Sequence, residues 1–147
     1  MLRFLLQWAR ADFHNPLSQF IVRVLGVSSV GSGLEGRTVA YHHGCYALRE
    51  LRVREEPLTL LQEAGASVVG WEAAEECCGF GGTFAVKQAD VSGAMVKDKT
   101  DALRATGAER VISQDCGCLM NIGGAFEKQG DGPATQHIAE FLLERTT

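Results

Sequence analysis

The sequence has no long apolar run and no strong excess of charge of either sign, and these two absences exclude two large classes of protein. No apolar stretch approaches the roughly 18 to 20 residues that a helix needs to cross a bilayer. With 14 Lys and Arg residues against 18 Asp and Glu residues, the net charge of -4 provides no basic surface for DNA or RNA. We therefore expect neither a transmembrane helix nor a nucleic-acid partner.

Common active-site motifs are also missing. The sequence contains no phosphate-binding loop, no complete Gly-x-Gly-x-x-Gly string and no Ser-His-Asp pattern. Its cysteines are an odd number, five, in a chain that is 46% hydrophobic, and such a chain does not need a disulfide framework. The cysteines are more typical of reduced thiols in a cytoplasmic protein.

The length of 147 residues suits one domain with a developed core. We expect residues 1–36 to form an N-terminal helix and connector, and residues 37–147 to form a cysteine-rich domain. The helix is predicted to begin after an N-cap at Asn15 and to end at Gly26. Residues 1–10 are interpreted as a surface or docking segment.

Three short, mostly apolar runs predict buried strands at residues 38–42, 67–71 and 110–113. Helical patterns follow them, and the predicted helices are at residues 46–51, 57–64, 88–106, 119–129 and 137–144. This alternation predicts an α/β fold, a three-layer parallel sheet with helices on both faces.

Every cysteine follows one of the predicted strands. Cys45 follows the first strand, Cys77 and Cys78 follow the second, and Cys116 and Cys118 follow the third. Because ligand sites of such folds lie at the carboxyl ends of the strands, we expect the thiols to meet at that edge of the sheet.

Thiols gathered at one edge can bind zinc, bind an iron-sulfur cluster or carry out thiol-disulfide exchange. Structural zinc sites usually take ligands in pairs two to four residues apart, and redox dithiols favour Cys-x-x-Cys, whereas this chain has Cys-Cys and Cys-x-Cys. A cluster accepts thiolates from dispersed loops and hydrogen bonds to its sulfurs. Glycines that would allow such approaches are Gly79, Gly81, Gly82, Gly117, Gly123 and Gly124.

Four strings of the sequence resemble the cysteine-rich CCG domain. They lie at residues 41–45, 75–84, 93–99 and 115–120, and the string Cys-Cys-Gly-Phe-Gly-Gly at residues 77–82 is the most specific. The chain is most similar to the second half of the lactate-utilisation iron-sulfur protein A family of Fe-S oxidoreductases. The cysteine-rich subunit of heterodisulfide reductase and the glycolate oxidase iron-sulfur subunit are more distant relatives.

The resemblance implies a [4Fe-4S]-type cluster, with zinc as a possible substitute. The implied ligands are Cys45, Cys77, Cys78 and Cys118, with Cys116 as a further candidate. Since the closing motif is Cys-x-Cys, it offers Cys116, Cys118 or both to the iron.

Other side chains near these cysteines are assigned supporting or structural roles. The residues expected to surround the ligands are His42, His43, Gly79, Gly81, Gly82 and Gly117. The remaining histidines, His14 and His137, are predicted to be structural. Lys97, Asp98 and Lys99 are interpreted as a solvated helix face.

For function, the resemblance implies an iron-sulfur electron-transfer subunit of a complex that oxidises L-lactate or a related 2-hydroxy acid. Such a subunit is an oxidoreductase component rather than a complete enzyme. Two alternatives stay open: a heterodisulfide-reductase-like cluster that acts on a thiol or disulfide substrate, and a zinc-bound or metal-free scaffold module.

The resemblance also implies partners. They are the other subunits of a lactate-oxidation complex and, because family members carry two cysteine-rich halves, a separate chain that supplies the first half. Contact with a membrane is expected only through these partners.

Overall fold

A computed structural model describes residues 16–144 of the chain. The predicted cap at Asn15, His14 and the docking segment at residues 1–10 lie outside this range. In chain order the elements are α2 (Leu17–Gln19), the π-helix η1 (Phe20–Val24), β1 (Thr38–Tyr41), α3 (Cys45–Arg49), α4 (Glu55–Glu63), β2 (Ser67–Val69), α5 (Thr83–Lys87), α6 (Ala89–Ala105), β3 (Arg110–Ser113), α7 (Cys116–Gln129), β4 (Ala134–His137) and α8 (Ile138–Leu143). No helix within residues 16–144 is both long enough and apolar enough to cross a membrane.

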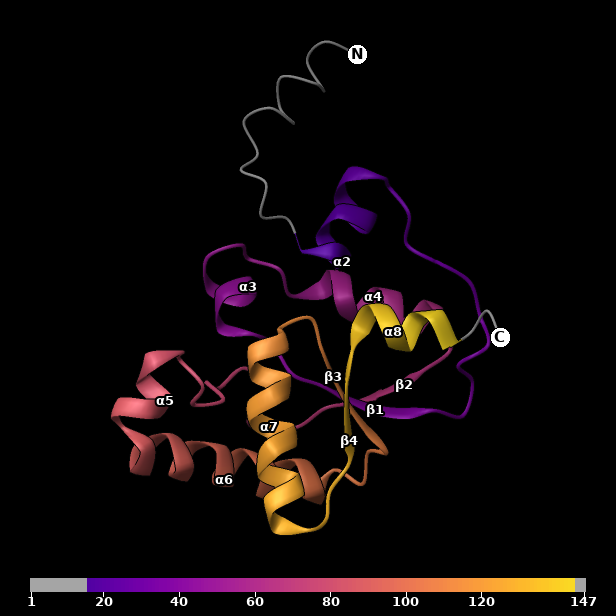
Figure 1. Cartoon of the computed structure of the whole chain (residues 1–147). Helices are drawn as coiled ribbons and strands as arrows, with labels where there is room; N and C mark the ends of the chain where they lie inside the picture. Colours follow the sequence, from indigo (N-terminus) through magenta and orange to yellow (C-terminus); the bar gives the residue numbers. More distant parts are fainter. Residues whose placement is uncertain (1–15, 145–147) are drawn as a thin grey trace.

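Four strands form one parallel sheet in the order β2-β1-β3-β4 (Figure 1). In the centre of the sheet Ala40 of β1 is paired with Val111 of β3 and, on its other side, with Val69 of β2. At the outer edge Ser113 of β3 is paired with His137 of β4. The order of the strands reverses between β1 and β3, and this is the position at which open α/β sheets bind ligands. The all-parallel sheet confirms the predicted α/β class.

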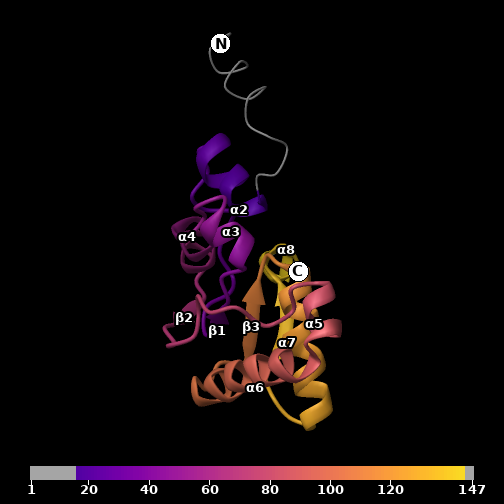
Figure 2. The same cartoon turned by 90° about the vertical axis from the view of Figure 1, so that its left-hand side faces the viewer.

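Alternate residues of the strands point to opposite faces of the sheet, as the pleat requires. Val39, Tyr41 and Ile112 belong to a core cluster that contains residues of α4 and α8. Their neighbours Ala40 and Val111 belong to a second cluster that contains residues of α6 and α7. The sheet therefore lies between two helical layers, and Figure 2 separates α2 and α4 at the top from α6 and α7 at the bottom.

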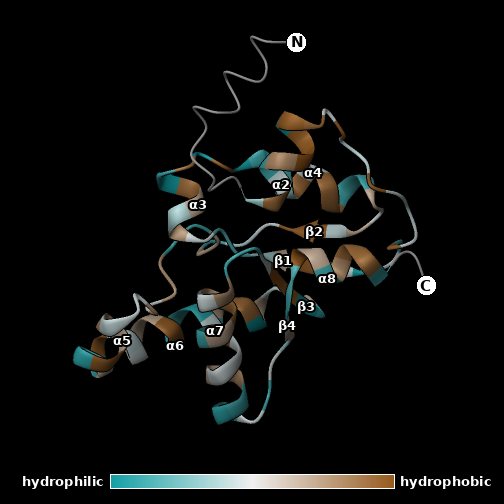
Figure 3. Ribbon diagram, turned by 45° about the horizontal axis from the view of Figure 1, so that its top comes forward, coloured by the Kyte–Doolittle hydropathy of each residue, from teal (hydrophilic) through white to brown (hydrophobic). Residues whose placement is uncertain are grey.

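The first of these layers is the more apolar one. Figure 3 shows hydrophobic stretches of α2, α4 and α8 gathered around β1 and β2. Leu34, in the connector before β1, is buried in the same cluster, and Ile21, Val22 and Val30 pack against it. The N-terminal helix and connector thus contribute to the core on this face of the sheet.

Two elements were not predicted from the sequence. The first is β4, whose sequence Ala-Thr-Gln-His has no apolar run. Such a run is not needed there, because β4 lies at the edge of the sheet and its side chains are at most partly buried. The short helix α5 follows the glycine-rich turn directly. In addition, α7 begins at Cys116 rather than at residue 119, because Asp115 is its N-cap. The first two strands end earlier than predicted, at Tyr41 and Val69.

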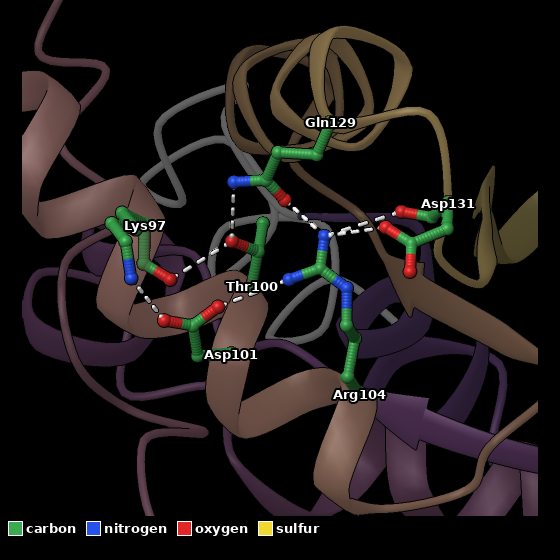
Figure 4. A network of polar contacts seen from close by, with 6 residues as sticks. All are labelled: Lys97, Thr100, Asp101, Arg104, Gln129 and Asp131. Carbon is green, nitrogen blue, oxygen red and sulfur yellow. Dashed lines mark hydrogen bonds and ion pairs between the residues drawn. The ribbon is translucent and has the colours of Figure 1, made fainter.

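Polar contacts join α6 to the end of α7 on the second face (Figure 4). The guanidinium of Arg104 donates to Asp101 and to Asp131 at 3.0 Å each, and it also donates to Gln129. Its carbon Cζ lies 5.3 Å from the centre of the Phe126 ring. These contacts fix the relative positions of the two helices that flank the cysteine-bearing loops.

Replacing Arg104 with Ala is expected to lower the free energy of unfolding by about 1 kcal/mol, because both its packing on Phe126 and its hydrogen bonds are lost. Urea denaturation measures this change. Lys97→Ala is the matched control on the same helix, since the side chain of Lys97 is exposed and contacts only Asp101 in the network of Figure 4, while its backbone carbonyl, which accepts from Thr100, is kept. Equal effects of the two substitutions would contradict the role given to Arg104.

Candidate functional site

The two central strands lead directly into the site. Beyond the end of β1, the backbone N–H of His42 donates to the carbonyl of Ile112 in β3 at 2.8 Å. The next residue, His43, donates its N–H to the carbonyl of Ala74 at 2.9 Å. Both histidine side chains are buried. The chain is therefore held by its backbone as it passes from β1 to Cys45, the first residue of α3.

At the centre of the site two cysteines from different loops meet. The Sγ atoms of Cys78 and Cys118 are 3.1 Å apart, and both residues are buried, free thiols. A ring nitrogen of His42 lies with them, and the three possible ligand atoms are all within 4.8 Å of one another. Nε2 of His42 is buried and has no hydrogen-bond partner among the described residues. A group of nitrogen and sulfur atoms at this spacing can hold a metal ion.

Cys118 is positioned by the start of α7. The carboxylate of Asp115, the N-cap, accepts a hydrogen bond from the backbone N–H of Cys118 at 3.0 Å. Asp115 also lies against Gly44, where an added Cβ would be 2.8 Å from Cβ of Asp115. A Cβ added at Gly117 would likewise lie 2.9 Å from the ring of Phe80. The residues before Cys45, after Cys78 and before Cys118 are therefore in direct contact.

The Cys77-Cys78-Gly79 turn is held by α6 and α7. The amide of Asn121 in α7 donates to the carbonyl of Cys78 at 2.8 Å, and the hydroxyl of Ser92 in α6 donates to the carbonyl of Gly79 at 2.7 Å. Gly79 has a φ of 83°, and an added Cβ would be 2.9 Å from the carbonyl oxygen of Ser92. Both the left-handed backbone and the lack of space require glycine here.

The remaining cysteines are less buried. Cys45 and Cys77 have intermediate exposure, whereas Cys116 is exposed. The pKa of Cys45 is raised, first by burial, next by its interaction with the Cys77 thiol, and also by Cys78. Electrostatic interactions thus connect Cys45, Cys77 and Cys78, and Cys118 is connected to Cys78 and to Cys45. The structure brings these four thiols together at the carboxyl edge of the sheet.

The two buried thiols, Cys78 and Cys118, form an inner pair that loses its two protons in unequal steps. The pKa of Cys78 is lowered to about 5, first by the hydrogen bond from Cys118 and also by His42. The same hydrogen bond, together with burial, raises the pKa of Cys118. One proton is therefore lost easily from the pair and the second is retained, which leaves a negative charge in a buried place.

Lys99 is a buried residue next to the site whose position the sequence analysis missed. It is 2% exposed, so the prediction of a solvated helix face is wrong for Lys99, although the side chain of Lys97 is exposed. Its Nζ donates to the carbonyl of Ala73 at 2.5 Å and lies 3.4 Å from Nδ1 of His42. The spacing of Lys99 from Val96 and Leu103, both buried, was the signal that could have placed it on the inner face of α6.

Other predicted residues have varied positions. Gly81 and Gly82 both have positive φ values, of 50° and 56°. Gly123 faces β4, because an added Cβ would be 2.7 Å from Oγ1 of Thr135, so its close neighbour is a strand rather than a thiol. His137 caps α8, since its Nδ1 accepts from the N–H of Ala139, and this confirms its structural role.

The chain is similar to known proteins along most of its length. Residues 39–123 match the CCG family, described as a cysteine-rich domain. The chain is 48% identical over 136 residues to the "Lactate utilization protein A" of Anoxybacillus flavithermus, which covers 92% of this chain and 57% of that protein. Identity to the "Uncharacterized protein YkgE" of Escherichia coli K12 is 45% over 130 residues, covering 88% of this chain and 54% of that protein.

A third relative is the "Lactate utilization protein A" of Bacillus cytotoxicus, 45% identical over 137 residues. That alignment covers 92% of this chain and 57% of the relative. The chain thus spans a little more than half the length of these curated relatives.

The burial of His43 predicts a pH dependence of stability. Burial, with Arg54 and His42 nearby, lowers the pKa of His43 from 6.5 to about 4. The unfolded chain therefore binds a proton that the folded chain does not as the pH falls from about 6.5 to about 4, and stability is lost over this window. One pKa unit corresponds to about 1.4 kcal/mol, and with solvent screening of this partly accessible site we expect a loss of about 1 to 2 kcal/mol for this residue.

Chemical denaturation of the metal-free protein between pH 4 and pH 7 measures this dependence. The variant His43→Gln has no titrating group at this position and should show a shallower slope. If the slopes of the wild type and the variant were identical, His43 would not be the group responsible.

Proposed function

Because the chain belongs to the CCG family of cysteine-rich domains, we propose that its cysteines bind an iron-sulfur cluster of the [4Fe-4S] type and serve in electron transfer. The proposed ligands are Cys45, Cys77, Cys78 and Cys118. The observation that carries the proposal is that Cys78, Cys118 and His42 are buried and close together at the carboxyl edge of the sheet.

The described residues fit such a group. Cys45 interacts electrostatically with Cys77, Cys78 and Cys118, and Cys78 forms a hydrogen bond with Cys118, whereas Cys116 is exposed. Nε2 of His42 is buried and unpaired, and leaving a buried polar atom without a partner costs about 1 to 3 kcal/mol. A metal centre next to this atom, or a sulfur that accepts its hydrogen, would remove that cost. This fit favours Cys118 over Cys116 as the ligand from the closing motif.

A bound cluster supplies a one-electron carrier, and the protein supplies its position and surroundings. The surrounding residues proposed for this are His42, His43, Gly79, Gly81, Gly82 and Gly117. Burial of Cys78 and Cys118 keeps water from the inner side of the site. The hydrogen bonds from Asn121 and Ser92 hold the Cys78 turn, so that the thiols need not reorganise when the charge of the centre changes.

The proposed physiological reaction is the oxidation of L-lactate or a related 2-hydroxy acid. Support comes from the names of two relatives, "Lactate utilization protein A", that are 48% and 45% identical to this chain. We propose that the chain is an oxidoreductase component in the cytoplasm, whose partners are the other subunits of a lactate-oxidation complex.

A second candidate is a structural zinc site. Neutral histidine and cysteine thiolates are the usual zinc ligands, and His42, Cys78 and Cys118 are already close enough to share one ion. Metal analysis separates the two candidates, because a zinc site contains no iron and no acid-labile sulfide.

Iron and acid-labile sulfide should be measured on protein purified without oxygen. We expect stoichiometric iron and sulfide in the wild type, and a loss of most of both in Cys78→Ala, because a central ligand is removed. Cys116→Ala is the matched control, and it should retain the cluster since Cys116 is exposed. Zinc without iron in the wild type would support the second candidate and refute the cluster.

The role in lactate oxidation is tested in cells that lack the gene. Growth on L-lactate as the carbon source should be restored by the wild-type gene and by Cys116→Ala, but not by Cys78→Ala. Growth on glucose controls for general effects. Normal growth on L-lactate without the gene would contradict the proposed substrate while leaving the cluster itself untouched.

A further inference from the structure

Lys99 is a buried cation that is not explained by the packing of α6. Burying an ammonium group is costly unless it is paired and hydrogen-bonded. Within residues 16–144 it forms no ion pair with a carboxylate; instead its Nζ donates to the carbonyl of Ala73 at 2.5 Å. It also lies 4.8 Å from the centre of the Trp71 ring. A carbonyl and an aromatic face stabilise a cation without neutralising it.

The charges that balance Lys99 come chiefly from the cysteine site. Burial lowers the pKa of Lys99, and the groups that raise it again are Cys78 first, then Glu76, Cys118 and Cys45. Three of these four groups are proposed ligands. In the metal-free protein the electrostatic partners of the buried ammonium are therefore the Cys78 thiolate and Glu76, and Cys118 and Cys45 join them when they ionise as ligands.

His42 lies between Lys99 and the thiols of Cys78 and Cys118. Its Nδ1 is 3.4 Å from Nζ of Lys99, and a ring nitrogen of His42 is within 4.8 Å of the sulfurs of Cys78 and Cys118. The residue is fully buried, and its backbone N–H is hydrogen-bonded to the carbonyl of Ile112 in β3. Lys99, His42 and the inner cysteines thus form one continuous buried row from α6 to α7.

We propose that Lys99 is the buried counter-charge of the cysteine centre, which it reaches through His42, and that it sets the reduction potential of the cluster whose binding is proposed above. Lys99 touches neither the substrate nor the ligand sulfurs, so it is a positioning residue that acts through an electrostatic field.

The sign of the effect follows from the charges. One-electron reduction adds one negative charge to the centre, and the electron comes from a one-electron donor. A nearby positive charge in a low-dielectric interior stabilises the reduced state more than the oxidised state. Lys99 should therefore raise the reduction potential.

The test is a redox titration of the reconstituted protein with dithionite and mediators. Lys99→Met should lower the equilibrium constant for reduction at least tenfold, which is about 59 mV for a one-electron couple. Lys99→Arg, which keeps the charge, should remain closer to the wild type. Lys97→Met removes an exposed charge from the same helix and should leave the potential unchanged.

Stability is recorded for each variant by thermal denaturation. Replacing a buried charge with an apolar side chain of similar size is often neutral or stabilising, so Lys99→Met is expected to fold. If it does not, Lys99→Gln keeps a donor for the Ala73 carbonyl while removing the charge, and the same fall in potential is expected. A wild-type potential in a folded, neutral variant would overturn the proposal.

A second measurement needs no cluster. In the metal-free protein, thiolate absorbance in the ultraviolet followed as a function of pH reports the negative charge on the cysteines, and its midpoint should rise by about one pH unit in Lys99→Met but not in Lys97→Met. If the wild type assembled no cluster, the proposed function would fail, and this absorbance alone would decide the inference. An unchanged midpoint in Lys99→Met would then overturn it.

Discussion

The parallel pairing of β1 with β3 determines where the cysteine centre forms. Tyr41 is paired with Ile112, and the pairing continues through the N–H of His42, so both strands end at the same level. Beyond that level, the segment after β1 enters α3 at Cys45, and the segment after β3 enters α7 at Cys116. The glycine-rich turn that carries Cys78 then closes on both, because Asn121 of α7 and Ser92 of α6 hold its carbonyls.

Bringing thiols together in a protein interior creates a problem of charge. Sulfurs 3.1 Å apart cannot both ionise without opposing charge nearby, and the low dielectric of the interior strengthens their repulsion. Backbone N–H groups can stabilise thiolates, but the N–H of Cys118 donates to the carboxylate of Asp115 and is not available to the sulfurs. A buried cation on α6 therefore matters to the site, even though it lies on an element without any cysteine.

Much of this architecture could be predicted from the sequence because the relevant signals are local. β3 was predicted with its observed bounds, since Val111 and Ile112 form an apolar run, and the long helix α6 was predicted to within one residue at each end. β4 could not be found in this way, because Thr135 and Gln136 are stabilised by pairing with β3 rather than by their own burial pattern. Such pairing depends on the assembled sheet.

The site shows the same limit. The strand-helix order predicted that the cysteines share one edge, and the structure places Cys45, Cys77, Cys78 and Cys118 there. Which thiols are inside is a matter of packing, and no spacing rule distinguishes buried Cys118 from exposed Cys116. Lys99 was missed for a different reason: charged residues are usually solvated, and that expectation outweighed the helical spacing that places it beside Val96 and Leu103.

The contrast between Cys116 and Cys118 also concerns damage by oxygen. Susceptibility of a cysteine to oxidation increases with its accessibility, and Cys116 stands at the surface as the first residue of α7. A peroxide that meets the folded chain thus encounters Cys116 before it reaches the inner pair. A sulfenic acid or mixed disulfide with glutathione at Cys116 would record this exposure, and it would not by itself mean that the interior thiols had been lost.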